Sequence, residues 1–245
     1  MLEARVRTAH ADGWAVEGAL REPFGGGAAT LRGIRLMASG LEHPQWNSAD
    51  VTGPYADLDG AREFYAARGV AWGVRVPAGM AWKAGRHLFR MPLMGMLAGG
   101  LREPAPVAGL TLRQAVPDDL EAVLAVDSTA FGSDPELYRP WTGPHLAAPQ
   151  VTVALAELDG EVVGTGYALR SDGAAGPAVF LGGIGVLDGA RRRGVAAAMS
   201  AWLLRRGFED GARLAHLHPV SDGAARVYDR LGFRTAGALD IYVDL

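Results

Sequence analysis

The chain has 245 residues, and its 24 Lys and Arg against 27 Asp and Glu give a formal net charge of −3, so no positive field favours a nucleic-acid partner. Hydrophobic residues form 49% of the chain and charged residues 21%, which excludes a disordered or fibrous protein and predicts a packed core. Because the chain has no cysteine, disulfides, thiolate metal sites and cysteine nucleophiles are excluded, and we predict no metal site.

The first twenty residues carry five charged side chains and lack an apolar run of signal-peptide length. Farther along, glycine or charged residues interrupt the apolar stretches before they reach the roughly 20 residues that a membrane helix needs. We therefore expect a cytoplasmic protein with no membrane partner.

The first half of the chain contains four patterned segments, in the order helix, strand, helix and strand. They are Leu58–Arg68, Val70–Val76, Met80–Arg86 and Phe89–Met96. Residues 1–40 show no clear pattern apart from a glycine loop at 25–27. Glycine, proline and charged residues then gather between 99 and 109, which is the composition of a connector. We place a boundary there, giving domains 1–107 and 108–245.

The second domain has the predicted order β-α-β-β-β-α-β-α-β, a mixed sheet with helices on its faces. Its strands are predicted at 110–114, 151–158, 161–169, 178–186, 213–218 and 239–243, and its helices begin at Pro117, Arg191 and Gly223. The four segments of the first half repeat the helix-strand-helix-strand order of the last third of the chain. This repeat indicates a duplicated and diverged domain, so the fold class is predicted as α/β (α+β) with two similar domains.

The sharpest motif is Arg191-Arg192-Arg193-Gly194-Val195-Ala196, which follows a glycine-rich strand and starts a helix. The first turn of a helix has unpaired N–H groups and a positive dipole end, so it can bind a phosphate or pyrophosphate. Small residues let a ligand approach the backbone, and arginines add charge. Taken alone, these residues also fit a solvated helix start. A P-loop has no match in the chain, and the glycine spacing after Gly183 does not fit a dinucleotide-binding fold.

A second motif runs from Ser221 to Phe233. Together the two motifs resemble the GNAT superfamily of acetyl-CoA-dependent N-acetyltransferases, with the likeness covering about 108–245. The family's pyrophosphate loop, Gln/Arg-x-x-Gly-x-Gly/Ala, is matched by Arg191, Gly194 and Ala196. Its later pattern, Asn-x-x-Ala-x-x-x-Tyr-x-x-x-Gly-Phe, is matched by Ala224, Tyr228, Gly232 and Phe233.

The resemblance implies where acetyl-CoA would bind. The pantetheine would lie in a splay between the strand that ends at Val186 and the strand 213–218, and backbone amides of the first motif would hold the pyrophosphate. Tyr228 would protonate the leaving CoA thiolate as general acid. The cofactor-binding residues implied are Ile184, Val186, Arg191, Arg192, Arg193, Gly194, Val195, Ala196 and Ser221. Ser221 replaces the family's Asn, which affects one pantetheine-side or capping hydrogen bond, although serine can still cap a helix.

A general base for the amine is missing from the central strand, because Phe180–Ile184 contains no carboxylate. We take His218, beside the expected CoA site, as the first catalytic candidate for this role. The alternatives are Asp127, Glu136, His216, the terminal carboxylate of Leu245, or water.

The first domain resembles a GNAT domain that has lost its cofactor site. In the overlay of the two halves, Asp57 and Asp59 fall where pyrophosphate would sit, and carboxylates there oppose anion binding. In the same overlay, the position that corresponds to Tyr228 falls near Trp82-Lys83, and neither of these residues carries a hydroxyl. The expected fold is therefore two GNAT-like domains, each a mixed, mainly antiparallel sheet flanked by helices, with one acetyl-CoA per chain.

We expect an enzyme that moves an acetyl group from acetyl-CoA to a primary amine of a small molecule, by direct attack because no cysteine can form an acyl-enzyme. Three aromatic residues in the acceptor region, Phe131, Tyr138 and Trp141, favour an amine with an apolar body. The alternative is a non-catalytic acyl-CoA-binding or interaction protein with the same fold. Tyr228 favours the enzyme, and the missing carboxylate favours the alternative. A homodimer is the default oligomer.

Overall fold

The structure is a computed structural model that describes residues 2–132 and 134–245, and its chain forms two compact units. Unit 1 contains the residues up to Met94 together with Gly173–Ala175 and Thr235–Leu245. Unit 2 contains Gly95–Asp172 and Gly176–Arg234. These units interleave along the chain, because the last strand belongs to unit 1. The domains 1–107 and 108–245, which follow sequence order, stay a prediction.

Unit 1 is built on a mixed sheet whose strands follow the order β1-β2-β3-β4-β11-β5. Pairs β1–β2, β2–β3 and β4–β11 are antiparallel, and β3–β4 is parallel. In chain order its elements are α1 (Leu2–Leu20), β1 (Gly27–Leu31), β2 (Ile34–Ala38), β3 (Asn47–Val51), α2 (Leu58–Ala66), β4 (Gly73–Pro77), β5 (Arg86–Leu97) and β11 (Arg234–Val243). Strand β5 passes into unit 2 at Gly95.

Helix α1 shows no apolar period in the sequence because it buries polar side chains, among them His10, Asp12 and Glu17. His10 Nδ1 lies 2.9 Å from Asp50 Oδ1 on β3, and Arg75 on β4 donates to Asp50 Oδ2 at 2.9 Å. Burial lowers the pKa of His10. Burial alone would raise the pKa of Asp50, but the neighbouring Arg75 charge and the His10 contacts hold it below its usual range. This buried network joins α1 to β3 and β4.

The helix predicted at Met80–Arg86 is absent, and that prediction is wrong. The segment is irregular, with bends at Met80, Ala84 and Gly85, before β5 begins at Arg86. Gly79 and Gly85 have φ angles of 86° and 77°, in the left-handed region that a right-handed helix excludes. Trp82 Nε1 donates to the backbone of Ala84 at 2.7 Å, which closes a local turn. The other three segments predicted in the first half are confirmed as α2, β4 and β5, with shifted ends.

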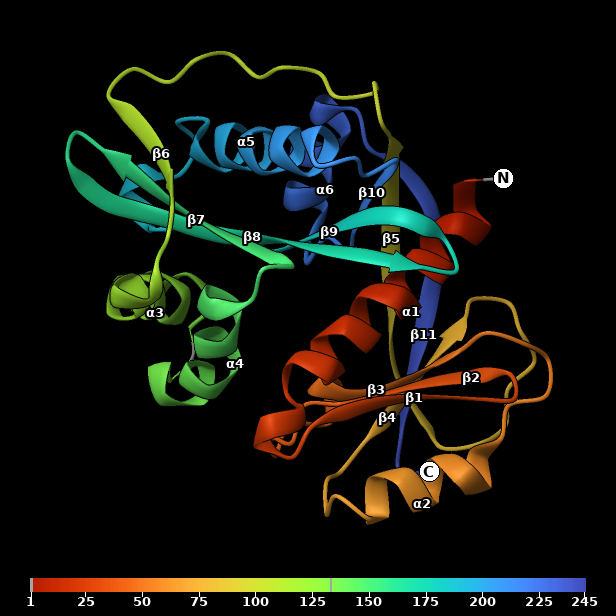
Figure 1. The fold of residues 1–245 in the computed structure, drawn as a ribbon. Helices are drawn as coiled ribbons and strands as arrows, with labels where there is room; N and C mark the ends of the chain where they lie inside the picture. The colour runs from red at the N-terminus through yellow and green to blue at the C-terminus, as the bar shows by residue number, and fades with distance from the viewer. Residues whose placement is uncertain (1, 133) are drawn as a thin grey trace. The chain divides into compact units, whose positions relative to one another are not determined.

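Unit 2 has the strand order β10-β9-β8-β7-β6, and the end of β5 lies beside β10. Pairs β6–β7 and β7–β8 are antiparallel, and β9–β10 is parallel. Its elements are β6 (Leu110–Gln114), α3 (Leu120–Phe131), α4 (Pro135–Ala147), β7 (Val151–Leu158), β8 (Glu161–Gly173), β9 (Gly176–Val186), α5 (Val195–Glu209), β10 (Leu214–Leu217) and α6 (Asp222–Leu231). Helices α3 and α4 lie on one face of this sheet and α5 on the other (Figure 1). The predicted α/β (α+β) class with mainly antiparallel sheets is confirmed.

Helix α4 is missing from the predicted order because its sequence argues against a helix. Pro140 and Pro144 lie inside it, and each removes a backbone donor. Tertiary burial compensates, since Trp141, Thr142 and His145 are covered by the rest of unit 2. Within residues 2–132 and 134–245, none of the helices combines the length and the apolar character that crossing a bilayer requires.

Candidate functional site

Strands β9 and β10 separate partway along their length. Their parallel pairing runs from Ala178 beside Leu214 to Phe180 beside His216. Strand β10 ends at Leu217 and Pro219 follows, whereas β9 continues to Val186. A proline has no N–H to donate to a neighbouring strand. The second half of β9 therefore runs on without β10 beside it.

One hydrogen bond to β8 shows in which direction the backbone N–H and C=O groups of this half of β9 point. The N–H of Leu187 donates to the carbonyl of Val163 at 2.9 Å. Because successive residues in a strand present their backbone groups to opposite sides, Ile184 and Val186 present theirs away from β8, toward the separation. The carbonyl of Val186 accepts from Arg191 Nε at 3.0 Å, so its N–H is the group left for a ligand.

The first motif forms a turn and a helix start. Arg192 and Gly194 have φ angles of 66° and 89°, and α5 begins at Val195 instead of the predicted Arg191. A residue in the left-handed region cannot continue a right-handed helix, which explains the shift. The first helical bond runs from the N–H of Ala198 to the carbonyl of Gly194 at 3.0 Å. The amides of Val195, Ala196 and Ala197 therefore precede the first donor of a helical bond, as pyrophosphate binding requires.

The three arginines of the motif differ in what they contact. Arg191 donates to the carbonyl of Val186, and its Nη1 lies 2.6 Å from Asp188 Oδ1, so this side chain fastens the loop to the end of β9. Arg193 Nη2 lies 3.8 Å from Asp159 Oδ2, and Arg192 is exposed. Arg191 would thus help phosphate binding indirectly, by holding the loop in shape. The charges of Arg192 and Arg193 lie near solvent.

Helix α6 carries the predicted general acid. Ser221 caps it, accepting from the N–H of Ala224 at 3.2 Å, as serine was expected to do. Tyr228 is half-buried and packs edge-on against Phe233 with ring centroids 5.8 Å apart. Burial raises the pKa of Tyr228 to about 12, so its phenol keeps its proton at neutral pH. In the described part of the chain this hydroxyl has no hydrogen-bond partner, which leaves its proton for a ligand.

The two histidines predicted beside the CoA site pack against one aromatic ring. The ring of His216 lies 5.3 Å and that of His218 5.5 Å from the ring of Phe180 on β9. His216 is buried within β10, and half-buried His218 follows the strand. The structure thus brings both to the point where β9 and β10 separate. A role of His218 as base stays a prediction.

Asp127 on α3 has the most unusual environment among the predicted acids. Its Oδ1 is covered by protein and has no hydrogen-bond partner among the described residues. Burial raises its pKa to about 7. A Cβ on Gly185 of β9 would lie 3.7 Å from this oxygen, so α3 points Asp127 at the separated half of β9. The sequence contained the signal, because Leu120, Val123 and Asp127 share one helical face and an acid there stands on an apolar stripe.

This carboxylate makes stability depend on pH. The folded pKa of Asp127 is about 7 and the unfolded value is about 3.9. The resulting stabilisation of the fold is fully present below pH 4 and is lost as pH rises through about 7, where the charge must be buried. We expect Asp127→Asn to exceed the wild type in unfolding free energy by about 2–4 kcal/mol at pH 8 and by little at pH 4.

Urea unfolding at both pH values measures this difference. The matched control is Asp118→Asn, which changes an exposed acid just before α3. The control should show the same small effect at both pH values. A stability difference for Asp127→Asn that did not change with pH would contradict the burial of its charge.

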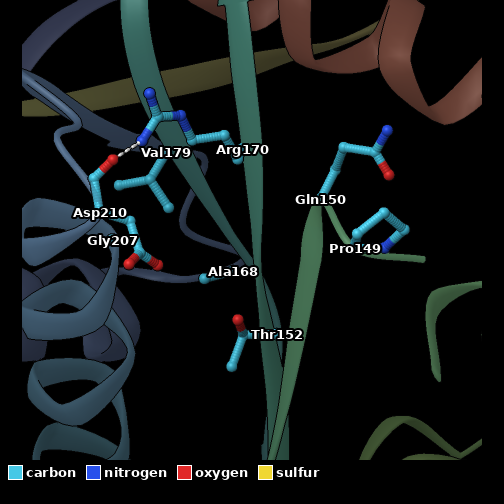
Figure 2. A pocket seen from close by; sticks show the side chains of 8 residues that line it. All are labelled: Pro149, Gln150, Thr152, Ala168, Arg170, Val179, Gly207 and Asp210. Carbon is cyan, nitrogen blue, oxygen red and sulfur yellow. Dashed lines mark hydrogen bonds between the residues drawn. The ribbon is translucent and has the colours of Figure 1, made fainter. Parts of the chain in front are cut away.

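A pocket lies at the opposite end of α5 from the Gly194 turn. It is lined by Pro149, Gln150, Thr152, Ala168, Arg170, Val179, Gly207 and Asp210 (Figure 2). Arg170 is engaged there, since it donates to the backbone of Asp210 and to the carboxylate of Asp172. The pocket is therefore not part of the predicted cofactor site, which consists of the half of β9 that runs on without β10 and the predicted pyrophosphate loop.

Unit 1 repeats the parallel strand-helix-strand arrangement with a different helix start. Strands β3 and β4 pair in parallel and are joined through α2, as β9 and β10 are joined through α5. Asp57 Oδ1 accepts from the N–H of Gly60 at 3.0 Å, so the chain's own carboxylate caps the first turn. Asp59 adds a second, exposed carboxylate there. An anion at this helix end would replace an existing bond and meet like charge.

Known proteins resemble this chain in part of its sequence and in its fold. The family model for the acetyltransferase (GNAT) family matches residues 119–233. A GCN5-related N-acetyltransferase from Kribbella flavida superposes with a TM-score of 0.73 at 23% identity, covering 98% of this chain and 95% of that one. A GCN5-related N-acetyltransferase from Sphaerobacter thermophilus gives 0.58 at 19% identity, covering 86% and 76%. A conserved protein of unknown function from Staphylococcus epidermidis gives 0.66 at 14% identity, covering 90% and 95%.

At these identities the solved structures show the fold, and their coverage extends over both units. A search of curated proteins gives no match. The family model covers the segment that contains the turn at Gly194, the start of α5 and Tyr228. The cosubstrate of that family is acetyl-CoA. Residues 119–233 thus form a domain of the acetyltransferase (GNAT) family, and the chain shares its fold with a GCN5-related N-acetyltransferase.

Proposed function

We propose that unit 2 is an N-acetyltransferase that moves the acetyl group of acetyl-CoA to a primary amine of a small molecule. One observation carries the proposal: the separated half of β9 leads directly into the Gly194 turn and the free amides of α5. The edge of β9 can form hydrogen bonds with an amide-containing chain such as pantetheine. The helix N-terminus that follows it along the chain can form hydrogen bonds with a pyrophosphate.

The residues present fit acetyl-CoA. Gly194 and Ala196 leave the start of α5 without bulky side chains, so phosphate oxygens can reach the amides of Val195 and Ala197. Ile184 offers both backbone groups to the separation, and Val186 its N–H. When bound, acetyl-CoA supplies an activated thioester carbonyl. Binding it is the task of backbone groups, with Arg192 and Arg193 adding positive charge nearby.

Tyr228 then acts on the leaving group. Its phenol is protonated at neutral pH because burial raises its pKa to about 12, and a protonated hydroxyl can donate to a departing thiolate. Packing against Phe233 fixes the direction of the ring. No covalent acyl-enzyme is needed, since the chain has no cysteine and the amine can attack directly.

Unit 1 would act without cofactor, because the carboxylate of Asp57 already caps α2. The cytoplasmic location, the homodimer and the small-molecule acceptor stay predictions.

The alternative is a non-catalytic acyl-CoA-binding protein, favoured by the lack of a carboxylate on β9 itself. A panel of primary amines, from aliphatic to aromatic, separates the two functions. The full chain is incubated with acetyl-CoA and each amine, and free CoA thiol and acetylated product are measured together. We expect at least one amine to give both in equal amounts. Tight acetyl-CoA binding without amine-dependent CoA release would favour the alternative.

A further inference from the structure

We propose that Asp127 is the general base of the transfer and the residue that recognises the acceptor, which must be a positively charged primary ammonium with an apolar body. The proposal rests on the proposed acetyltransferase function. It assigns to α3 a role that the sequence analysis gave first to His218.

The position of Asp127 carries the inference. Helix α3 packs on β9, and Ala130 and Phe131 approach Gly185 closely: a Cβ there would lie 3.0 and 3.3 Å from them. Asp127 is one helical turn earlier, with Oδ1 3.7 Å from the same point. Gly185 lies between Ile184 and Val186, whose backbone groups face the proposed pantetheine. Asp127 therefore stands beside the strand segment at which the thioester would bind.

One carboxylate oxygen of Asp127 also has no hydrogen-bond partner among the described residues. Oδ1 is sealed from water and accepts no hydrogen bond within the described residues, yet the residue is only half-buried. Part of the residue other than Oδ1 therefore reaches the surface. A buried acceptor left unpaired costs about 1–3 kcal/mol, more when charged, so a site that keeps one has a use for it.

Among the described residues, no neighbouring charge pairs with Asp127. The charged groups on the elements packed against α3 have other partners: Arg139 on α4 pairs with Glu121 and Glu136, Asp119 before α3 pairs with Arg113, and His145 packs against Trp141 and Tyr167. Arg191 after β9 pairs with Asp188 and donates to the backbone carbonyl of Ala130 on α3, at 3.4 Å. Asp118 is exposed. Only burial raises the pKa of Asp127. The cation that completes this site must come from outside the described chain.

An ammonium group meets this requirement. It would donate to the carboxylate and lay its carbon body against Phe131, whose ring is partly exposed next to Gly185. A carboxylate with a pKa near 7 is a stronger base than an ordinary aspartate, so it is better able to take a proton from an ammonium whose own pKa is about 10. A neutral alcohol would leave the buried charge uncompensated and bind poorly.

The protons balance across the reaction. One N–H proton passes from the ammonium to Asp127, and the neutral amine then forms the new N–C bond. As the C–S bond breaks, Tyr228 gives its proton to sulfur, and the second proton leaving nitrogen restores the phenol through water. The products are the acetylated amine, CoA thiol and one proton, which Asp127 releases to solvent.

The test measures kcat, KM and acetyl-CoA affinity from pH 5.5 to 9 for wild type, Asp127→Asn, Asp127→Glu and the control Asp118→Asn. In the wild type, kcat/KM should rise through an inflection near pH 7. Asp127→Asn should lower kcat/KM for an alkylamine by about 10²–10⁴-fold and remove the inflection, with unchanged acetyl-CoA affinity. Asp127→Glu should restore part of the rate, and Asp118→Asn should match the wild type.

A second acceptor separates a base from a structural carboxylate. An arylamine is already neutral at pH 7, so its acetylation should depend much less on Asp127 than that of an alkylamine. An equal loss for both amines, or an Asp127→Asn variant that keeps the rate and the inflection, would overturn the assignment. A wild-type chain that binds acetyl-CoA and acetylates no amine would overturn the proposed function as well.

Discussion

Gly194→Glu is expected to abolish acetyl-CoA binding while the chain still folds. Gly194 stands immediately before α5 with a φ of 89°, where its missing side chain leaves the amides of Val195 to Ala197 open. A glutamate would place a negative charge within a few ångströms of the phosphates, and two like charges 4 Å apart repel by about 4 kcal/mol near a protein surface. Calorimetric titration with acetyl-CoA measures the loss.

The control is Gly194→Gln, which has the same size without the charge. Both variants place a side chain at a left-handed position, at a cost of about 1–2 kcal/mol of stability. Both also bring a Cβ within 3.1 Å of Val107. Thermal unfolding should therefore show equal losses for the two, while acetyl-CoA affinity should fall further for glutamate. Unchanged affinity in folded Gly194→Glu would remove the Gly194 turn from the cofactor site.

Tyr228→Phe is expected to lower turnover by about 10²–10⁴-fold and to leave acetyl-CoA affinity nearly unchanged. Only the hydroxyl is lost, and the ring keeps its packing against Phe233. Because burial raises the pKa of Tyr228 to about 12, ionisation of this phenol should not reduce activity below about pH 10. The fall in rate corresponds to roughly 3–5 kcal/mol of barrier.

Steady-state rates need one check before they report on Tyr228. Rapid-quench measurement of the first turnover shows whether acetyl transfer limits the wild type. If transfer is rate-limiting and Tyr228→Phe keeps nearly full turnover, the tyrosine is a packing residue of α6 and another group protonates the thiolate.

Much of unit 2 is predictable from sequence because its motifs fall at element ends. The turn before α5, the cap at Ser221 and the glycine that ends α6 are each set by local backbone chemistry, which a single sequence displays. The hairpin at Asp159-Gly160 is local in the same sense, and both residues adopt positive φ. These features also position the proposed pyrophosphate loop and Tyr228.

The elements that sequence analysis missed depend on distant contacts. Helix α1 hides its period because it buries His10 against Asp50 of β3, a partner forty residues away. Helix α4 contains two prolines and is held by burial. The sequence predicts strand β11 at 239–243, but not its pairing with β4 of unit 1, because the chain reaches β11 from unit 2. None of these pairings leaves a local pattern.

The acceptor side of the site is the least predictable from sequence for the same reason. The sequence places His218 ahead of Asp127 because His218 lies beside the expected CoA site. Its sealed oxygen depends on how α3 packs against β9, and only tertiary structure shows that an acid on an apolar stripe faces Gly185.

The central claim is that one chain holds one acetyl-CoA, at the start of α5, although its fold is repeated. Calorimetric titration of the wild type with acetyl-CoA tests it most directly, with Gly194→Glu titrated in parallel. We predict saturation at one equivalent per chain and none for the variant, because Asp57 already caps the matching helix α2. A second equivalent in the wild type, or one equivalent that survives Gly194→Glu, would show that acetyl-CoA binds elsewhere and would contradict this account.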